Sequence, residues 1–342
     1  MAQDLITTVT TKNDFKQAFT RAHLNASDTV IIHTSLSKFY YVPAGPKTVI
    51  LALKETISKG TIMMPSEVST NCDPATWEYP PVRSDLMETI RDNMPPYDPI
   101  TSATEGLGIT PEYFRTLPDV VRSNHPYLPI AIWGKNKIQI AKEQLLNLPY
   151  GINSPLDYLY KNNGKIVFLG TDYETCTALH YAESTINRPT ETWSAATGFN
   201  EQGKTTWTDY QNVDLDSYDD FNELGLDFEK QYPECFNQVS LNNSFIKVIE
   251  MRPLIDFARD WFKKKDNNIK QKSRNKSYFF CYIRYTITVI VAAPIMMAKP
   301  IKVTTISFLV FFSCKNQIPV RVANTTDVCD KINPVAKPFI FG

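Results

Sequence analysis

The stretch ETCTALHYAE, residues 174–183, places His180 and Glu183 three positions apart on a predicted helix. Side chains at i and i+3 lie on the same face of a helix, so the imidazole and the carboxylate are neighbours. A neutral imidazole can accept a proton near pH 7, and a carboxylate beside it orients the ring. The two residues could form an interior hydrogen bond, ligate a metal ion, or work as an acid–base pair. Their spacing alone leaves all three open.

A second polar cluster follows a predicted strand. In IIHTSLSKF, residues 31–39, a histidine and several hydroxyl side chains precede a loop that contains glycine and proline. Proteins with α/β sheets bind ligands at this place, beyond the carboxyl end of a strand. Backbone N–H groups there, together with Ser35 and Ser37, could hold a pyrophosphate or a pantetheine arm. The alternative is that the hydroxyl groups only cap turns.

Strand and helix signals alternate along the chain around these clusters. Apolar residues at helical spacing predict helices over 48–57 and 153–164. The second has Asn153 or Ser154 as its cap and Pro155 near its start. Short apolar or β-branched runs predict buried strands at 29–33, 61–65, 129–134, 165–170 and 245–250. This alternation predicts a single α/β domain, with a central mixed sheet flanked by helices.

Composition limits the partners of this domain. The 36 basic residues balance 36 acidic ones, so total charge predicts neither nucleic acid nor an anionic membrane as a partner. No two of the six cysteines form a CxxC pair, which argues against a zinc knuckle. The first residues are polar and lack the layout of a secretion signal. We therefore expect a cytoplasmic protein with free thiols, as a monomer or homodimer.

The regular pattern ends near residue 266. A polar, basic run follows, and then an apolar stretch without clear periodicity. Its first apolar run, 285–298, is short for a membrane span and contains Pro294. We predict one folded domain over 1–266 and an atypical, poorly ordered C-terminal extension over 267–342.

Six motifs lie in a characteristic order along the chain. They are HTSLS at 33–37, GPKTVILAL at 45–53, DPATWEYPPV at 73–82, VVRSNHP at 120–126, INSPLDYLY at 152–160 and TALHYAE at 177–183. In order and spacing, the chain resembles the aminoglycoside 3-N-acetyltransferase family over about residues 10–265. The resemblance rests on the whole set, because no single motif is specific.

The resemblance implies a fold and a reaction. Members of this family have an α/β fold and transfer an acetyl group from acetyl-coenzyme A to the 3-amino group of the deoxystreptamine ring, without a metal ion. An amine is protonated at pH 7 and must lose a proton before it attacks a thioester. The resemblance implies direct attack, with no covalent enzyme intermediate. Cys176 is therefore expected to pack as a small apolar residue.

The resemblance also assigns residues to roles. It implies that His180 is the general base and that Glu183 orients it or binds a cation. It places Asp73 and Asp214 near the polycationic antibiotic. The residues expected to bind the coenzyme, or in the case of His125 to shape its pocket, are His33, Thr34, Ser35, Leu36, Ser37, Ser102, Thr104 and His125.

Several positions depart from the family pattern. Glu105 stands where a basic residue is usual, and a charge reversal facing a coenzyme phosphate costs about 1–3 kcal/mol in binding. Tyr40 and Ala44 replace common glycines, while Pro129 and Ile132 replace a usual serine and alanine. These departures motivate an alternative, in which the chain is an inactive or binding-only relative, or acetylates a different amine.

A metal-dependent hydrolase is another alternative. His180, Glu183 and His33 would then be ligands. No further His, Asp or Glu pattern at ligand spacing supports this interpretation.

Overall fold

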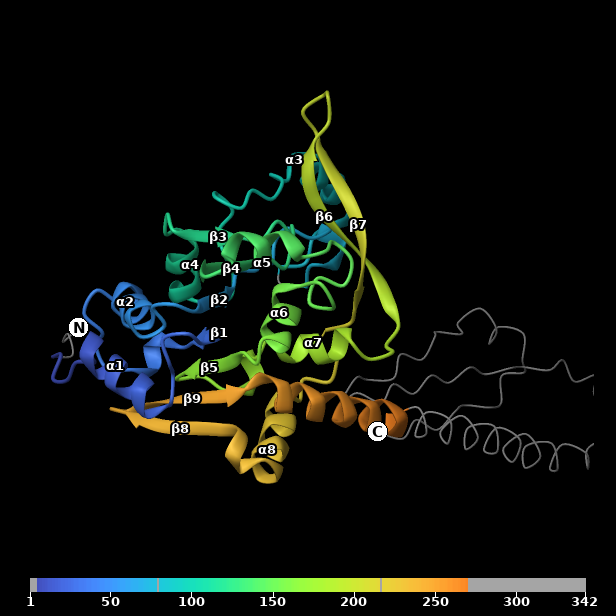
Figure 1. Cartoon of the computed structure of the whole chain (residues 1–342). Helices are drawn as coiled ribbons and strands as arrows, with labels where there is room; N and C mark the ends of the chain where they lie inside the picture. Colours follow the sequence, from blue (N-terminus) through green and yellow to red (C-terminus); the bar gives the residue numbers. More distant parts are fainter. Residues whose placement is uncertain (1–4, 79, 216, 270–342) are drawn as a thin grey trace, which may run out of the picture. The chain divides into compact units, whose positions relative to one another are not determined.

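The computed structural model describes residues 5–78, 80–215 and 217–269 (Figure 1). The expectations for the apolar run 285–298, and for nearly all of the predicted extension 267–342, lie outside the described residues.

A seven-stranded mixed sheet forms the centre of the fold. The strands β2, β1 and β5 are parallel neighbours, and the outer strands join them antiparallel. The mixed α/β fold expected from the sequence is confirmed. In spatial order the strands are β3 (Val120–Arg122), β4 (Ile130–Gly134), β2 (Thr61–Pro65), β1 (Thr29–Thr34), β5 (Lys165–Leu169), β9 (Ser244–Glu250) and β8 (Phe236–Leu241).

Helices cover both faces of this sheet. Because successive strand side chains point to opposite faces, Ile31 belongs to one hydrophobic core and its neighbours Val30 and Ile32 to the other. The core of Val30 and Ile32 includes residues of α1 (Lys12–Arg21), α2 (Pro46–Thr56) and α4 (Ile109–Arg115). The core of Ile31 includes residues of α5 (Lys137–Glu143), α6 (Pro155–Lys161), α7 (Leu179–Ser184), α8 (Phe221–Gln231) and the helix 251–269.

The local signals that predicted these elements have clear structural causes. In α6, the Ser154 side chain accepts a hydrogen bond from the backbone N–H of Asp157 at 3.2 Å, and Pro155 occupies the first turn. Between α2 and β2, a Cβ atom on Gly60 would lie 1.9 Å from the carbonyl oxygen of Asp28, so this close approach requires glycine.

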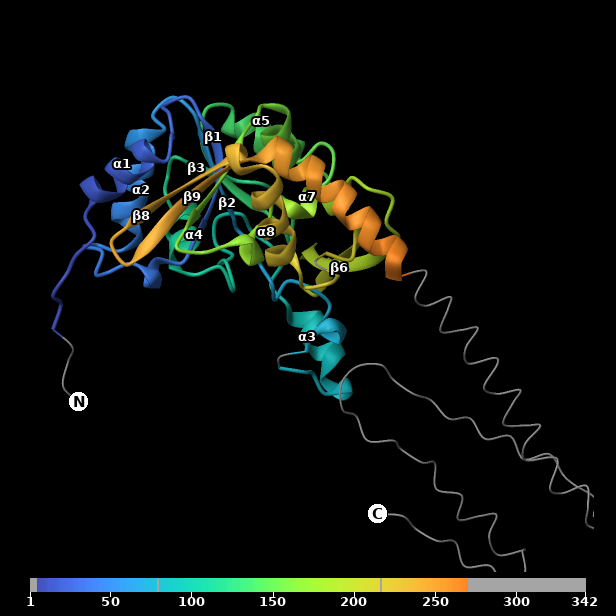
Figure 2. The same cartoon turned by 90° about the horizontal axis from the view of Figure 1, so that it is seen from below.

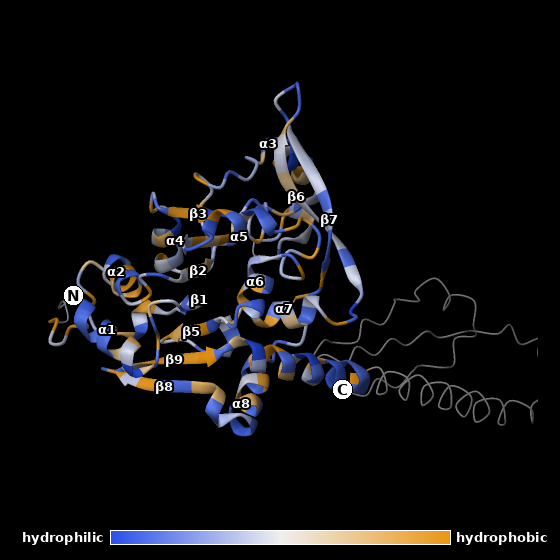
Figure 3. Ribbon diagram, in the orientation of Figure 1, coloured by the Kyte–Doolittle hydropathy of each residue, from blue (hydrophilic) through white to orange (hydrophobic). Residues whose placement is uncertain are grey.

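One part of the fold was not predicted from the sequence. Strands β6 (Thr190–Phe199) and β7 (Thr205–Val213) form a separate antiparallel hairpin, which extends past the central sheet (Figures 1 and 2). Apolar residues concentrate on strands of the seven-stranded sheet such as β9, whereas much of β7 is polar (Figure 3). The region 66–108, which includes α3 (Met87–Asn93), packs on this hairpin; for example, the backbone N–H of Tyr97 donates to the carbonyl oxygen of Ala196 at 3.2 Å.

Candidate active site

His180 and Glu183 lie on the short helix α7 and are in direct contact. Their Nδ1 and Oε2 atoms are 2.7 Å apart. The helix begins at Leu179, so the first half of the predicted helical stretch is instead a 3-10 helix, Tyr173–Thr175, followed by a turn. Since the carboxylate accepts the hydrogen on Nδ1, Nε2 is the imidazole nitrogen that can accept a proton.

Aromatic rings fix the orientation of the His180 side chain. Tyr150 stacks on its ring at 5.7 Å between centroids and 5° between planes, and Phe221 contacts it at 5.2 Å. The Tyr150 hydroxyl in turn donates to Glu67 Oε1 at 2.7 Å. Burial raises the pKa of Tyr150 well above its usual value, so this phenol remains a hydrogen-bond donor. The imidazole is thus positioned by packing as well as by Glu183.

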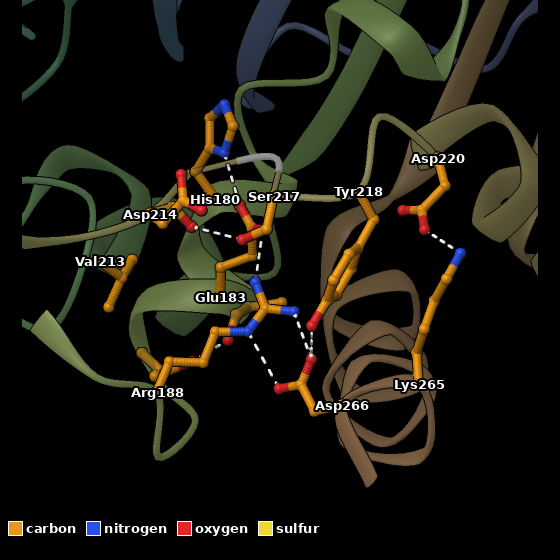
Figure 4. A network of polar contacts seen from close by, with 12 residues as sticks. His180, Glu183, Arg188, Val213, Asp214, Ser217, Tyr218, Asp220, Lys265 and Asp266 are labelled. Carbon is orange, nitrogen blue, oxygen red and sulfur yellow. Dashed lines mark hydrogen bonds and ion pairs between the residues drawn. The ribbon is translucent and has the colours of Figure 1, made fainter. Parts of the chain in front are cut away.

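A charged network holds the carboxylate of Glu183, which is only 1% exposed. Arg188 Nη1 donates to Glu183 Oε1 at 2.6 Å, and the same guanidinium binds Asp266 through two bonds of 3.1 Å (Figure 4). The Tyr218 hydroxyl also donates to Asp266, at 2.7 Å. The helix 251–269 therefore helps to position the active-site carboxylate.

Five of the eight residues expected to bind the coenzyme line one pocket of about 690 Å³. They lie at and just after the carboxyl end of β1 and are His33, Thr34, Ser35, Leu36 and Ser37. Gly106 and Gly108, which have positive φ angles of 74° and 82°, line it from a second loop. Thr171 and Thr175, from the loop before α7, also line it. The pocket therefore adjoins the segment that leads to His180.

His33 connects this pocket with the acid–base pair. Its side chain is buried, and it lies close enough to His180 that the charge of His180 adds to burial in lowering the pKa of His33 to about 3. His33 is thus neutral at pH 7.

The other three residues expected to bind the coenzyme are absent from the lining of this pocket. Thr104 donates from its backbone N–H and its hydroxyl to Glu112 Oε2, at 2.7 and 2.9 Å. The Ser102 hydroxyl accepts from the backbone N–H of Asp98 at 3.0 Å. Both side chains stabilise the loop that carries Gly106 and Gly108.

His125 is bonded to the backbone on both sides of its ring. Its Nδ1 accepts from the N–H groups of Tyr127 and Leu128, at 3.2 and 2.9 Å, and its Nε2 lies 3.1 Å from the Leu146 carbonyl oxygen. Burial lowers the pKa of His125 to about 4. Because both nitrogens of this neutral ring form hydrogen bonds to the backbone, His125 stabilises the loop before β4.

The two carboxylates expected to bind the antibiotic lie in different surroundings. Asp73 forms an ion pair with Arg91 of α3, whose Nη2 is 2.7 Å from Oδ1. In both views α3 lies apart from α7 (Figures 1 and 2). Asp214 is exposed, and its carbonyl oxygen accepts from the Ser217 hydroxyl at 3.0 Å, in the loop drawn beside His180 and Glu183 (Figure 4).

The departures from the family pattern fall mostly outside the pocket. Both carboxylate oxygens of Glu105 accept hydrogen bonds from Thr70, at 2.7 and 2.9 Å, and Glu105 does not line the pocket. Pro129 is buried, and Ile132 is fully buried in β4. Tyr40, by contrast, is partly exposed and lines the pocket.

One further residue can be compared with expectation. Cys176 is 1% exposed, and burial raises the pKa of its thiol to about 12, so its packing as an apolar residue is confirmed. Of the other histidines, His23 is exposed and follows α1.

Neither a metal cluster nor a membrane helix is found in the part of the chain that the structure describes. Within it, no group of three or more His, Cys, Asp or Glu side chains could hold a metal ion, so His180, Glu183 and His33 gain no support as ligands. No helix within it is long and apolar enough to cross a membrane. A pocket of about 700 Å³ beside α5 contains none of the predicted site residues.

The fold and the site together define an acyltransferase of α/β type with a histidine–carboxylate pair beside a pocket. The chain belongs to the aminoglycoside 3-N-acetyltransferase family, whose model matches residues 31–263.

Individual relatives agree with this assignment. The chain is 33% identical over 264 residues to YokD of Bacillus subtilis, an SPbeta prophage-derived aminoglycoside N(3′)-acetyltransferase-like protein. The matched stretch covers 76% of this chain and 96% of the relative. It is 32% identical over 198 residues to the aminoglycoside N(3)-acetyltransferase VIII of Streptomyces fradiae, covering 56% of this chain and 67% of the relative.

Solved structures are similar over the same part of the chain. The crystal structure of YokD from Bacillus subtilis has a TM-score of 0.71 at 32% identity and covers 76% of this chain and 96% of that one. The structure of AAC-IIIb as a binary complex with CoASH has a TM-score of 0.65 at 23% identity and covers 75% of this chain and 98% of that one. The second likeness concerns the fold alone.

Sequence reasoning missed three residues around the acid–base pair: Tyr150, Arg188 and Asp266. Arg188 and Asp266 are 78 positions apart in sequence, and no motif spacing connects them. The position of Arg188, five residues after Glu183, carries no helical signal because α7 ends at Ser184.

Proposed function

We propose that the chain transfers the acetyl group of acetyl-coenzyme A to the 3-amino group of a 2-deoxystreptamine aminoglycoside and so gives antibiotic resistance. The observation that carries the proposal is the 2.7 Å contact between His180 and Glu183, beside His33 and its pocket. Membership of the family makes this reaction the one to test first.

In the proposed reaction, His180 is the general base. The substrate ammonium group first loses one proton to solvent. As the neutral amine nitrogen attacks the thioester carbon, Nε2 of His180 removes one of its two remaining protons. A C–N bond forms, the C–S bond breaks, and the proton on His180 passes to the departing sulfur. Glu183 stabilises the imidazolium that exists between these steps, and Arg188 keeps the carboxylate in place.

The coenzyme is proposed to occupy the pocket formed by residues 33–37 and 106–111. Hydroxyl groups of Thr34, Ser35 and Ser37 offer hydrogen bonds to its pantetheine arm. Among the solved relatives, the complex of AAC-IIIb with CoASH has a related fold. The protein itself contributes no metal to this chemistry, because a general base and a reactive thioester are sufficient.

The antibiotic is proposed to approach from the Asp214 side. This exposed residue lies in the loop next to the acid–base pair, and a carboxylate attracts a polycation. A relative of similar fold, AAC-VIa, has been solved bound to sisomicin. Since Asp73 is already paired with Arg91, we assign the antibiotic contact to Asp214 first and to Asp73 only if that ion pair opens.

Acetylation of a different amine is a second candidate. The Asp73–Arg91 ion pair favours it, because it lowers the negative charge available to a substrate with several amino groups. A monoamine would need fewer carboxylates than an aminoglycoside.

The first experiment mixes purified protein with acetyl-coenzyme A and tobramycin or gentamicin and follows the release of free thiol. We expect release with the wild-type protein, none with His180→Ala, and a single acetyl group on the antibiotic by mass spectrometry. Coenzyme binding without release would direct the search to other amines. Failure to bind coenzyme would overturn the proposal.

A further inference from the structure

We propose that His33 is a second catalytic residue, which donates a hydrogen bond from Nε2–H to the carbonyl oxygen of the bound acetyl thioester. The inference rests on the proposed function and assigns a new role within the same site. It separates two histidines by task, with His180 moving a proton and His33 stabilising negative charge.

The placement of His33 supports this role. It is the fifth residue of β1, in register with Phe168 of β5, and its ring lies 5.7 Å from the Phe168 ring. The pairing of β1 with β5 holds its backbone, and its side chain is 5% exposed and lines the pocket. A rigid, desolvated position of this kind suits a group that must be in place before the reaction begins.

The hydrogen bonding of His33 is the second observation. Its Nε2 is buried and has no hydrogen-bond partner among the described residues. A buried polar atom without a partner destabilises the fold, and such a group in a folded protein calls for an explanation. A ligand oxygen in the adjoining pocket would provide the partner.

The charge state of His33 matches a donor and excludes a second base. Burial and the neighbouring charge of His180 lower its pKa to about 3. A neutral imidazole has one N–H donor, and the ring stays neutral when His180 takes up the proton of the amine. His33 therefore keeps the same hydrogen-bonding capacity throughout the reaction.

The proposed step is balanced without further reactants. When the amine nitrogen forms its bond to the thioester carbon, the electron pair of the C=O bond moves to oxygen. Nε2–H of His33 donates to this oxyanion. The pair returns to re-form C=O as the C–S bond breaks and the sulfur receives the proton held by His180. A preorganised donor of this type contributes about 10²–10³ in rate.

The test compares His33→Leu with His33→Gln. Leucine removes the donor at similar volume, whereas glutamine can place an amide N–H near the Nε2 position. We expect His33→Leu to lower kcat about 100-fold and to bind CoASH, which lacks the carbonyl, within about twofold of wild type. His33→Gln should regain part of the rate. An unchanged kcat in His33→Leu, or an equal loss in its affinity for CoASH, would overturn the inference.

A measurement on the wild-type protein covers the case in which His33→Leu does not fold. With ¹⁵N-labelled histidine, the four histidines give a simple NMR spectrum. A stable ketone analogue of acetyl-coenzyme A should shift the His33 Nε2–H signal, and CoASH should not; identical spectra would contradict the inference. If wild-type protein releases no thiol with any amine, the proposed function itself is wrong. If wild-type protein is active and His33→Leu is equally active, only the role of His33 is wrong.

Discussion

The regions around His180 and His125 show how surroundings decide what a histidine can do. His180 contacts a carboxylate through one nitrogen and aromatic rings through its faces, and its side chain is 17% exposed. His125 has both nitrogens bonded to backbone groups and is 2% exposed. A carboxylate stabilises an imidazolium, whereas backbone N–H donors at Nδ1 require the neutral ring. The first surroundings permit proton transfer, and the second permit only a structural role.

The largest expected effect comes from His180→Ala. We expect kcat to fall by about 10²–10⁴, the usual contribution of a general base, while coenzyme and antibiotic still bind. Steady-state kinetics and calorimetric binding measure both. His23→Ala, at an exposed position after α1, is the matched control. A near-normal rate in His180→Ala would mean that this histidine is not the base.

The next effect comes from the network behind Glu183. Arg188→Gln removes a charged partner of a carboxylate that is 1% exposed. Breaking a buried ion pair of this kind costs about 3–5 kcal/mol, so we expect a lower free energy of unfolding and a reduced kcat. Urea unfolding and kinetics report the two effects.

Asp266→Asn should lower the free energy of unfolding and kcat by less than Arg188→Gln does. Asp266 contacts Arg188, and so affects Glu183 only through Arg188. Asp260→Asn, whose carboxylate is 72% exposed, is the control on the same helix. Equal effects of the two Asn substitutions would show that Asp266 does not position Glu183.

Acid stability tests the structural side of the comparison. Burial lowers the folded-state pKa of His125 to about 4, below the usual histidine pKa of 6.5. Between these values the unfolded chain binds the proton more readily, so stability present above pH 6.5 is lost as pH falls toward 4, by up to about 3 kcal/mol. Urea unfolding at several pH values should show this loss, and His125→Asn should reduce it. His33 adds a loss of the same sign. An unchanged pH dependence in His125→Asn would contradict the assignment.

The smallest effect is expected at Glu105. Its carboxylate is held by Thr70 outside the pocket, so Glu105→Gln should change the KM for acetyl-coenzyme A by less than about twofold. At such a partly exposed position outside the core the free energy of unfolding should change by about 0.5 kcal/mol or less. A marked improvement in KM would show that the carboxylate faces a coenzyme phosphate after all.

Sequence patterns predicted the central elements because those patterns are local. The run TVIIH became β1, TIMMP became β2, and the capped stretch around Ser154 became α6. The hairpin of β6 and β7 was missed. It packs on the 66–108 region instead of the central sheet, so its strands show no clear alternation of apolar and polar residues.

The acidic run at 207–229 illustrates the same limit. Carboxylates in such a run can bind a cation or remain solvated, and the run includes most of β7 and α8. One of its carboxylates, Asp220, is paired with Lys265 of the C-terminal helix. Charge density alone could not distinguish a ligand-binding carboxylate from one used within the fold.

By itself, the sequence determined the contact between His180 and Glu183, because an i, i+3 spacing on a helix fixes neighbours locally. It also predicted that residues 33–37 lie where a strand passes into a loop, and these residues line the pocket. Only the tertiary structure decided that His33 lies beside His180, that Arg188 and Asp266 hold Glu183, and that His125 is bonded to backbone. These contacts join segments distant in sequence, and the packing that brings them together depends on the whole core.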